Sequence, residues 1–344
     1  MNISIQNTIL KTISKIKKKN YYKFDASLIK NINTCPICNS IKKKIISNVI
    51  INSKNINQTS FCKVCSHIYR SKTFNNNWFR KCWSLIEERE PKVINPILEK
   101  YRKNRYKSYV KIIKKYNTNI NLNTLDIGAA FGSGSEILRA AKFNVECLEP
   151  EINRLKILKK KNFVAHNSFL ECFKSKKKFD VIIAAHILEH CLDLKKSLTN
   201  LKNLLKDINS IVYIEVPYIK FYLDFFDIFY LPHRNNFLLK NIIYLLKKRG
   251  FKILESKIKY YSDEKKVISL VVKIDTNNFN NNIPKKIHNF DIYKLYKKKS
   301  PFKNIKFPIN VIADYISNFF YIIRIDRGNF LLKNNFIYFK HKSK

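Results

Sequence analysis

Four cysteines in the N-terminal part of the chain form two C-x-x-C pairs whose spacing suits a metal ion. The pairs are Cys35-Pro36-Ile37-Cys38 and Cys62-Lys63-Val64-Cys65. Each pair places two thiols on one tight turn, so the four sulfur atoms complete a tetrahedral ligand set for zinc. Such an ion would be structural, because four thiolates leave no position open for water. A redox pair, a chance pairing and ligation by His67 are the alternatives.

A second cluster consists of glycines in a chain that has few of them. Three of the five glycines, Gly128, Gly132 and Gly134, follow the apolar run Leu125-Asp126-Ile127. Glycine is needed where φ is positive or where a ligand approaches the main chain closely. The spacing D-x-G-x-x-x-G-x-G differs from the dinucleotide fingerprint, and no P-loop lysine follows it. The segment predicts a cofactor-binding turn between a strand and a helix; a tight turn without a ligand is the alternative.

Two carboxylates flank this turn. Asp126 precedes the first glycine, and Glu149 ends the next strand-like run. A carboxylate ahead of the glycines suits a sulfonium cation and its ammonium group better than a phosphate. Glu149 can accept hydrogen bonds from both hydroxyls of an adenosine ribose. The pair therefore predicts a nucleoside cofactor that carries positive charge.

The elements around the turn alternate between strand and helix. Strands are expected over 122–127, 144–148, 179–185 and 210–216, and helices over 135–142, 151–160, 192–206 and 235–248. This alternation predicts an α/β fold with a Rossmann-like, doubly wound, mostly parallel sheet. The runs 251–260 and 266–274 have no helix between them, so they predict an antiparallel hairpin at the edge of that sheet.

Changes in composition divide the chain into five segments. They are a basic N-terminal helix or lead-in over 1–34, a small zinc-binding domain over 35–70, a helical connector over 71–120, the cofactor-binding domain over 121–275, and a basic aromatic tail over 276–344. No run of about 18 apolar residues exists, so no transmembrane segment is expected. We expect a cytoplasmic protein, with the tail a candidate for peripheral contact with a membrane surface.

The formal net charge of +42 suggests a polyanionic partner only at first sight. The abundant residues, Lys, Asn, Ile, Tyr and Phe, are those of A- and T-rich codons, and the lysines are spread along the whole chain. Mutational bias and a solvated surface therefore explain the charge as well as nucleic acid does. Charge alone does not identify a partner.

The glycine turn and its two carboxylates resemble the first motif and the second strand of the class I S-adenosylmethionine-dependent methyltransferases. Residues 179–190 are similar to that family's fourth-strand signature, an aspartate-led strand that ends in Leu-Glu-His. The resemblance covers about 121–275 and implies a methyltransferase domain. It implies that the cofactor is bound by Asp126, Gly128, Gly132, Gly134, Glu149 and His186. For the adenine amine it implies a polar group after the third strand, where this chain has Asn167 and Ser168.

A four-cysteine domain ahead of this fold resembles the sugar C-methyltransferases that act on nucleotide-linked deoxysugars. Glu215-Val216-Pro217-Tyr218 matches one of their segments, and residues 226–233 align with their Phe-Asp-x-Ile-Tyr-His-Glu-His stretch. Leu231 and Pro232 replace the first histidine and the glutamate of that stretch, so carbon as the methylated atom stays open. Tyr230 and His233 are kept.

Methyl transfer from a sulfonium needs mainly an aligned nucleophile and a group that removes its proton. His233 is the candidate base because its ordinary pKa is near neutrality, and Tyr218 or Tyr230 would orient the acceptor. We expect a methyltransferase for a sugar, a nucleotide-sugar or a related small molecule in glycan or cell-surface biosynthesis. The alternatives are an RNA methyltransferase that grips RNA with its zinc knuckles and lysines, and a non-catalytic zinc-bearing adaptor.

Overall fold

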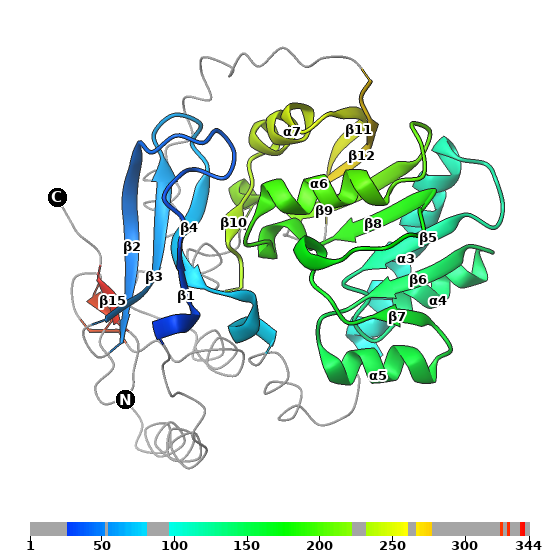
Figure 1. The fold of residues 1–344 in the computed structure, drawn as a ribbon, viewed down its shortest axis with the longest axis horizontal. Helices are drawn as coiled ribbons and strands as arrows, with labels where there is room; N and C mark the ends of the chain where they lie inside the picture. Colours follow the sequence, from blue (N-terminus) through cyan, green and yellow to red (C-terminus); the bar gives the residue numbers. More distant parts are fainter. Residues whose placement is uncertain are drawn as a thin grey trace.

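The structure is a computed structural model, and its elements form two sheets that lie side by side (Figure 1). It describes residues 26–51, 54–80, 96–221, 232–260 and 266–276, and short strands at 324–325, 329–330 and 338–340. One sheet carries the cysteine pairs at its end, and the other is the core of the α/β region. Among the described helices, none is both long enough and apolar enough to cross a bilayer.

The larger sheet has seven strands in the order β11-β12-β9-β8-β5-β6-β7. These are β5 (Asn123–Ile127), β6 (Asn144–Leu148), β7 (Val164–His166), β8 (Val181–Ala185), β9 (Ile211–Pro217), β11 (Phe251–Tyr260) and β12 (Lys266–Ile274). The neighbouring strands β9, β8, β5, β6 and β7 pair in parallel. Strand β12 runs antiparallel to both β9 and β11. The Rossmann-like, mostly parallel sheet with an antiparallel edge hairpin is therefore confirmed.

Helices cover both faces of this sheet. They are α3 (Pro96–Tyr116), α4 (Ser133–Ala140), α5 (Ile152–Lys160), α6 (Leu194–Leu204) and α7 (Leu239–Lys248). Strand β8 shows why its sequence is apolar at every position: Ile182 and Ala184 pack in the cluster that contains α6 and α7, and Val181 and Ile183 pack in the cluster that contains α3 and α4. Successive side chains point to opposite faces, so a strand buried on both faces shows no alternation.

Local capping sets where two of these helices begin. The side chain of Glu151 accepts a hydrogen bond from the main-chain N–H of Arg154 at the start of α5, and Asp193 accepts one from Lys196 at the start of α6. Three-residue 3₁₀ turns connect the rest: η2 (Leu170–Cys172), η3 (Leu188–His190) and η4 (Ile219–Phe221). The carboxyl ends of β5, β6 and β8 therefore meet at one edge, above which these loops lie.

The smaller sheet contains the cysteine pairs and one strand from the α/β region. Four of its strands are β1 (Ile29–Asn31), β2 (Lys43–Ile51), β3 (Lys54–Cys62) and β4 (Ile68–Phe74). Beyond β2 the sheet continues with β15 (Tyr338–Lys340), β14 (Asn329–Phe330) and β13 (Arg324–Ile325). Strand β10 (Asn235–Asn236) pairs antiparallel with β4. We call residues 35–74, with the cysteine pairs and β2 to β4, the zinc module.

Two expectations about helices change. The helix expected over 235–248 begins only at Leu239, because Asn235 and Asn236 are extended and pair with β4. The helix expected over 1–34 lies mostly outside the described residues, and its described end forms a 3₁₀ turn, η1 (Ala26–Leu28), followed by β1. Tertiary pairing overrides the helical preference at Asn235 and Asn236.

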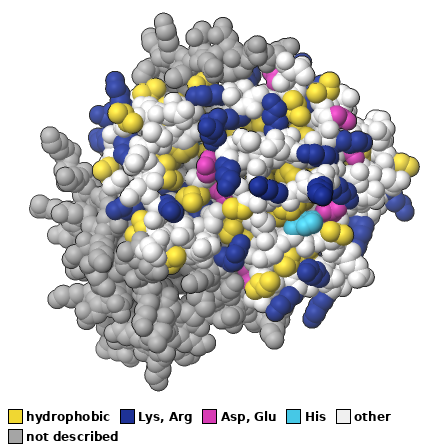
Figure 2. Space-filling model, viewed as in Figure 1, with side chains coloured by type: hydrophobic (Ala, Val, Ile, Leu, Met, Phe, Trp, Pro, Cys, Tyr) yellow, Lys and Arg dark blue, Asp and Glu magenta, His cyan; other side chains and the backbone are white. Residues whose placement is uncertain are grey.

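The basic side chains do not gather into one band on the face that Figure 2 shows. Lys and Arg are dispersed over its described part, Asp and Glu are few, and hydrophobic side chains lie between them. A dispersed pattern fits a solvated surface as well as a polyanion-binding one. The picture therefore adds no specific sign of a nucleic-acid partner on this face.

Candidate active site

The glycine turn joins β5 to α4, and the local geometry requires glycine at each of its three glycine positions. Gly128 and Gly132 have φ of 71° and 81°, a region that side chains disfavour. A Cβ on Gly128 would also lie 2.4 Å from Cδ1 of Ile187. A Cβ on Gly134 would meet the ring of Tyr106 at 2.4 Å, so this glycine lets α3 pack closely on α4. No larger residue fits the turn as it is built.

Asp126 is fully buried beneath the turn. Its Oδ1 accepts a hydrogen bond of 2.8 Å from the Tyr106 hydroxyl, and its Oδ2 accepts one of 2.6 Å from Ser135 Oγ. Burial raises the pKa of Asp126 to about 6, against the lowering effect of these two hydroxyls. Asp126 is not among the described residues that line the adjacent cavity. Its contacts tie the turn to α3 and α4.

Glu149 follows β6 and lies in the cavity wall. Its Oε2 accepts a hydrogen bond of 2.9 Å from the main-chain N–H of Ala130, and its Oε1 accepts one of 3.0 Å from that of Glu151. Burial raises the pKa of Glu149. An ionised carboxylate has about four acceptor positions, so two remain for ligand hydroxyls. This is the arrangement that a ribose requires.

The two candidates for the adenine contact differ in position. Asn167 Nδ2 donates to the carbonyls of Glu149 and Pro150 at 3.2 and 3.0 Å, so its amide group holds the loop after β6. Ser168 lines the cavity, and its Oγ donates to the carbonyl of Phe169 at 3.0 Å. Ser168 is therefore better placed than Asn167 to meet a ligand.

A cavity of about 150 Å³ lies over the carboxyl ends of β5, β6 and β8. One half of its wall contains Gly128, Glu149, Ser168 and His186, which the sequence singled out for the cofactor. Doubly wound sheets bind ligands at this edge. The other half contains Phe79, Ile187, Glu171, His190, Cys191 and Arg234. We call these two parts the cofactor half and the acceptor half.

His186 lies at the end of β8 between two buried carboxylates. Its φ is +58°, and its Nδ1 and Nε2 lie 3.1 Å from Glu189 Oε1 and 3.3 Å from Glu215 Oε1. Burial alone lowers the pKa of His186, but the two carboxylates raise it to about 9. Burial likewise acts against ionisation of Glu215, whereas His186 and Arg105 hold its pKa at about 2. His186 is therefore an imidazolium at neutral pH, with both ring nitrogens facing carboxylates.

His190 has the properties of a neutral base. Its Nδ1 lies 3.0 Å from the carbonyl oxygen of Pro232, which can only accept, so Nδ1 carries the proton and Nε2 the lone pair. Burial lowers the pKa of His190. The ring lines the cavity, and the ring of His233 lies beside it at 5.0 Å between centroids. The structure thus places His190 at the wall and the predicted base, His233, next to it.

Of the two predicted tyrosines, the structure describes only Tyr218. Tyr218 is buried, bridges to Phe237 and is not among the described residues that line the cavity. Tyr230 lies outside the described residues. The geometry of the described residues therefore gives Tyr218 no direct route to an acceptor.

No sequence motif pointed to Arg234, Glu171 or Phe79. The guanidinium of Arg234 lies 4.3 Å from the ring centroid of Phe79, and its Nη1 donates to Asn76 Oδ1 at 2.7 Å. Asn76 in turn donates to Glu171 Oε2 at 2.6 Å. These residues come from three distant parts of the chain, and no periodicity or motif links them. Only the position of Arg234 directly after His233 pointed toward it.

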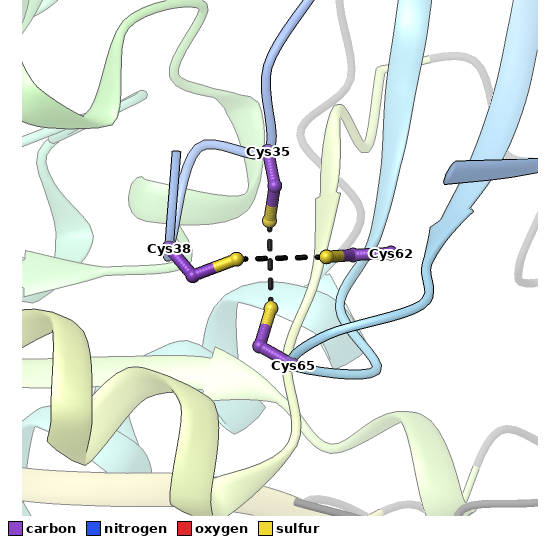
Figure 3. Close-up of side chains that lie close together, drawn as sticks. All are labelled: Cys35, Cys38, Cys62 and Cys65. Carbon is purple, nitrogen blue, oxygen red and sulfur yellow. Dashed lines mark hydrogen bonds between the residues drawn. The ribbon is translucent and has the colours of Figure 1, made fainter. Parts of the chain in front are cut away.

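The four cysteine sulfurs converge on one point (Figure 3). The Sγ atoms of Cys35 and Cys65 lie 3.4 Å apart, those of Cys38 and Cys62 lie 3.5 Å apart, and all four lie within 4.8 Å of one another. Ligands at about 2.3 Å from a tetrahedral zinc ion have a similar separation, close to 4 Å. The cluster is buried and fits a structural zinc ion.

The two knuckles have the same backbone geometry. The residue after each second cysteine has positive φ, 64° at Asn39 and 60° at Ser66. Its N–H donates back to the carbonyl of the first cysteine, at 2.9 Å to Cys35 and 3.0 Å to Cys62. Repetition of one turn at both pairs argues against chance pairing. His67 is outside this ligand cluster, and its Nε2 lies 3.3 Å from Asn235 Oδ1.

Comparison with known proteins identifies the class of domain. Residues 98–256 match a protein family described as a methyltransferase domain. A sequence search among proteins of curated function found no match. The matched range contains the glycine turn, Glu149 and the loop with His190.

Solved structures that resemble the chain do so at low identity. A S-adenosylmethionine-dependent methyltransferase from Clostridium acetobutylicum has 14% identity and a TM-score of 0.42, over 57% of this chain and 99% of that chain. Magnesium protoporphyrin IX methyltransferase from Synechocystis has 15% identity and a TM-score of 0.43, over 58% and 94%. The N-methyltransferase NodS from Bradyrhizobium japonicum has 13% identity and a TM-score of 0.41, over 51% and 97%.

The chain therefore carries a methyltransferase domain on a Rossmann-like sheet. This domain marks the chain as a methyltransferase, in line with the expectation from its glycine turn.

Proposed function

We propose that this methyltransferase acts in the cytoplasm on a small acceptor that contains a sugar, such as a nucleotide-linked sugar. One observation carries the proposal: a single cavity joins the cofactor half to an acceptor half whose wall presents the neutral imidazole of His190. The four-cysteine module and residues 215–218, which resemble the sugar C-methyltransferases, support the choice of a sugar.

The residues on the cofactor half would hold S-adenosylmethionine, which supplies an electrophilic methyl group on a sulfonium. The bare main chain at Gly128 lets the ligand approach, and the two remaining acceptor positions of Glu149 receive the ribose hydroxyls. Ser168 contacts the adenine end. Asp126 keeps the turn in place through Tyr106 and Ser135.

The acceptor half would orient the nucleophile and receive its proton. His190 takes the proton at Nε2, because its Nδ1 is already committed to the carbonyl of Pro232. His233, with its ring beside that of His190, is the next group able to carry the proton. Phe79 and Ile187 limit the access of water to the methyl group.

The zinc ion is the second proposed group. Cys35, Cys38, Cys62 and Cys65 would hold it in a purely structural role, since all four positions of a tetrahedral ion are taken. Such reduced thiols persist in the cytoplasm. Zinc content by mass spectrometry of the purified protein, expected at one ion per chain, tests this assignment.

The test of the proposed function is calorimetry with S-adenosylhomocysteine, followed by transfer of a labelled methyl group to a panel of nucleotide-sugars. We expect saturable binding with a dissociation constant on the order of 1–100 μM, within the usual range of enzyme substrates. We also expect label in at least one sugar. Absence of binding heat would overturn the cofactor assignment, and binding without label in any sugar would overturn the acceptor class.

RNA is the second candidate acceptor, because of the net charge of +42. If the chain gripped RNA, the logarithm of its affinity would fall steeply and linearly with the logarithm of salt concentration. Transfer of label to RNA with such a salt dependence would favour this alternative over the sugar.

A further inference from the structure

The acceptor half depends on one loop, Ile187–Cys191, which we call the acceptor loop. It supplies Ile187, His190 and Cys191 to the cavity wall. Outside the short turn η3 it has no regular secondary structure of its own. Its position must therefore come from contacts with other segments.

Arg234 holds the middle of the acceptor loop. Its main-chain N–H donates to the carbonyl of Glu189 at 2.7 Å, and its Nη1 donates to the carbonyl of His190 at 2.7 Å. Two residues before Arg234, the carbonyl oxygen of Pro232 accepts a hydrogen bond from His190 Nδ1. The segment around β10 thus fixes both the backbone and the ring of His190.

Asn235 holds the two ends of the loop. Its Nδ2 donates to the carbonyl of Cys191 at 2.9 Å and to that of Leu188 at 3.5 Å. Its Oδ1 faces His67 Nε2 at 3.3 Å. The side chain is 2% exposed, and these bonds use both of its donors. All four carbonyls from Leu188 to Cys191 are therefore bound by residues 234 and 235.

The opposite side of β10 is attached to the zinc module. Asn235 and Asn236 pair with Tyr69 and Ile68 of β4, and the N–H of Arg70 donates to the carbonyl of Arg234 at 2.9 Å. The carbonyl of His67 accepts from the N–H of the zinc-ligand candidate Cys62 at 2.8 Å. A continuous set of hydrogen bonds therefore runs from a knuckle through His67 and Asn235 to the acceptor loop.

We propose that Asn235 is a positioning residue through which the zinc module sets the acceptor loop, and with it His190. The role of the loop in binding the acceptor rests on the proposed function, whereas the coupling between zinc module and loop does not. The cofactor half is attached differently: hydrogen bonds within residues 128–166 hold Gly128 and Glu149, and its approach to the acceptor loop is the close position of Ile187 beside Gly128. Loss of the coupling should disturb one half of the cavity and spare the other.

The chain offers a matched control in Asn241. This asparagine lies in α7 and is also fully buried at the boundary with the zinc module. Its Nδ2 donates a hydrogen bond of 3.1 Å to the carbonyl of Cys65. Among the described residues, its side chain makes no hydrogen bond to the acceptor loop. Asn235→Ala and Asn241→Ala therefore remove equal side chains at the same boundary, and only the first touches the loop.

The experiment measures hydrogen–deuterium exchange in full-length protein, with peptides that cover residues 187–191, and calorimetric binding of S-adenosylhomocysteine. For Asn235→Ala we expect exchange in these peptides to increase at least about tenfold, which corresponds to about 1.4 kcal/mol. Affinity for S-adenosylhomocysteine should change less than about threefold, since the cofactor half keeps its contacts. Asn241→Ala should leave exchange in the loop within about twofold of the parent protein.

Two further arms keep the proposal open to refutation. Asn235→Asp keeps the size of the side chain but loses both donors, so it should reproduce the alanine variant. Removal of zinc with a chelator should raise exchange in the same peptides. Unchanged exchange in Asn235→Ala, or equal increases in the two alanine variants, would overturn the proposal. If the parent protein itself did not bind S-adenosylhomocysteine, that result would contradict the proposed function and leave the coupling measurement valid.

Discussion

The two halves of the cavity are built in different ways. The cofactor half comes from a continuous stretch, residues 128–168, in which α4, β6, α5 and β7 follow one another. The acceptor half combines Phe79, the acceptor loop and residues 232–234, which lie far apart in the sequence. Hydrogen bonds within the turns hold the first half, whereas hydrogen bonds between segments hold the second.

This difference separates the part of the cavity that would bind the nucleoside from the part that would meet the acceptor. A strand–turn–helix unit binds one nucleoside wherever the unit occurs, because its glycines and its carboxylate act locally. An acceptor wall made of separate segments can change its shape when any one of them changes. We infer that the zinc module stabilises the acceptor half, whereas the cofactor half is stable without it.

The largest expected effect follows from loss of a zinc ligand. Cys62→Ser should abolish zinc binding and unfold the zinc module, because structural zinc contributes about 10–16 kcal/mol in small zinc-dependent domains. Zinc content and thermal unfolding measure the change, and S-adenosylhomocysteine calorimetry shows whether the cofactor half survives. Cys172→Ser replaces an exposed thiol and should behave as the parent protein. Loss of cofactor binding in Cys62→Ser would break the distinction between the halves.

The second effect concerns the acceptor half alone. His190→Ala should lower turnover by about 10²–10⁴-fold, the usual contribution of a general base, with unchanged affinity for S-adenosylhomocysteine. The assay is transfer of a labelled methyl group. His166→Ala is the matched control, since His166 pairs with Glu146 and does not line the cavity. An active His190→Ala variant would shift the role of base to His233.

The third effect concerns the glycine turn, where the cofactor half meets Ile187 of the acceptor loop. Gly128→Ala should weaken binding of S-adenosylhomocysteine by about 10–100-fold, because its Cβ would meet Ile187 in a backbone of positive φ. Gly250→Ala introduces the same backbone strain, with φ of +77°, after α7, where the new Cβ would meet only the flexible end of Lys202. Thermal unfolding should show a loss of stability in both variants. Equal loss of cofactor affinity in both would show that the turn is not specific.

The smallest expected effect is a dependence of stability on pH through His186. The folded protein raises the pKa of His186 to about 9 from an ordinary value of 6.5. This group therefore adds stability that is complete below pH 6.5 and is lost as the pH rises through 9. The free energy of unfolding measured at pH 6 and pH 9.5 should differ less in His186→Gln than in the parent protein. An equal dependence in both proteins would contradict the paired imidazolium.

The sequence predicted the α/β sheet well because the features that define its strands and helices lie within short segments. The fully apolar run of β8, and the acidic caps that begin α5 and α6, are local features that survive in the folded chain. It failed at residues 235–236, where a helical pattern lost to pairing with β4. It also could not show that the carboxylate of Asp126 would be occupied by Tyr106, because that contact depends on how α3 packs.

The amino-acid sequence by itself determined the parallel sheet, the glycine turn, Glu149 and the two cysteine knuckles. Each of these depends on backbone angles, side-chain periodicity or spacing within a short segment, which the order of residues expresses directly. Only the tertiary structure decided that His190 lines the wall with His233 beside it, that Arg234 and Phe79 join them, and that Asn235 ties them to the zinc module. Those relations depend on the burial of polar groups between distant segments, and each such group takes whichever partner the packed chain brings to it.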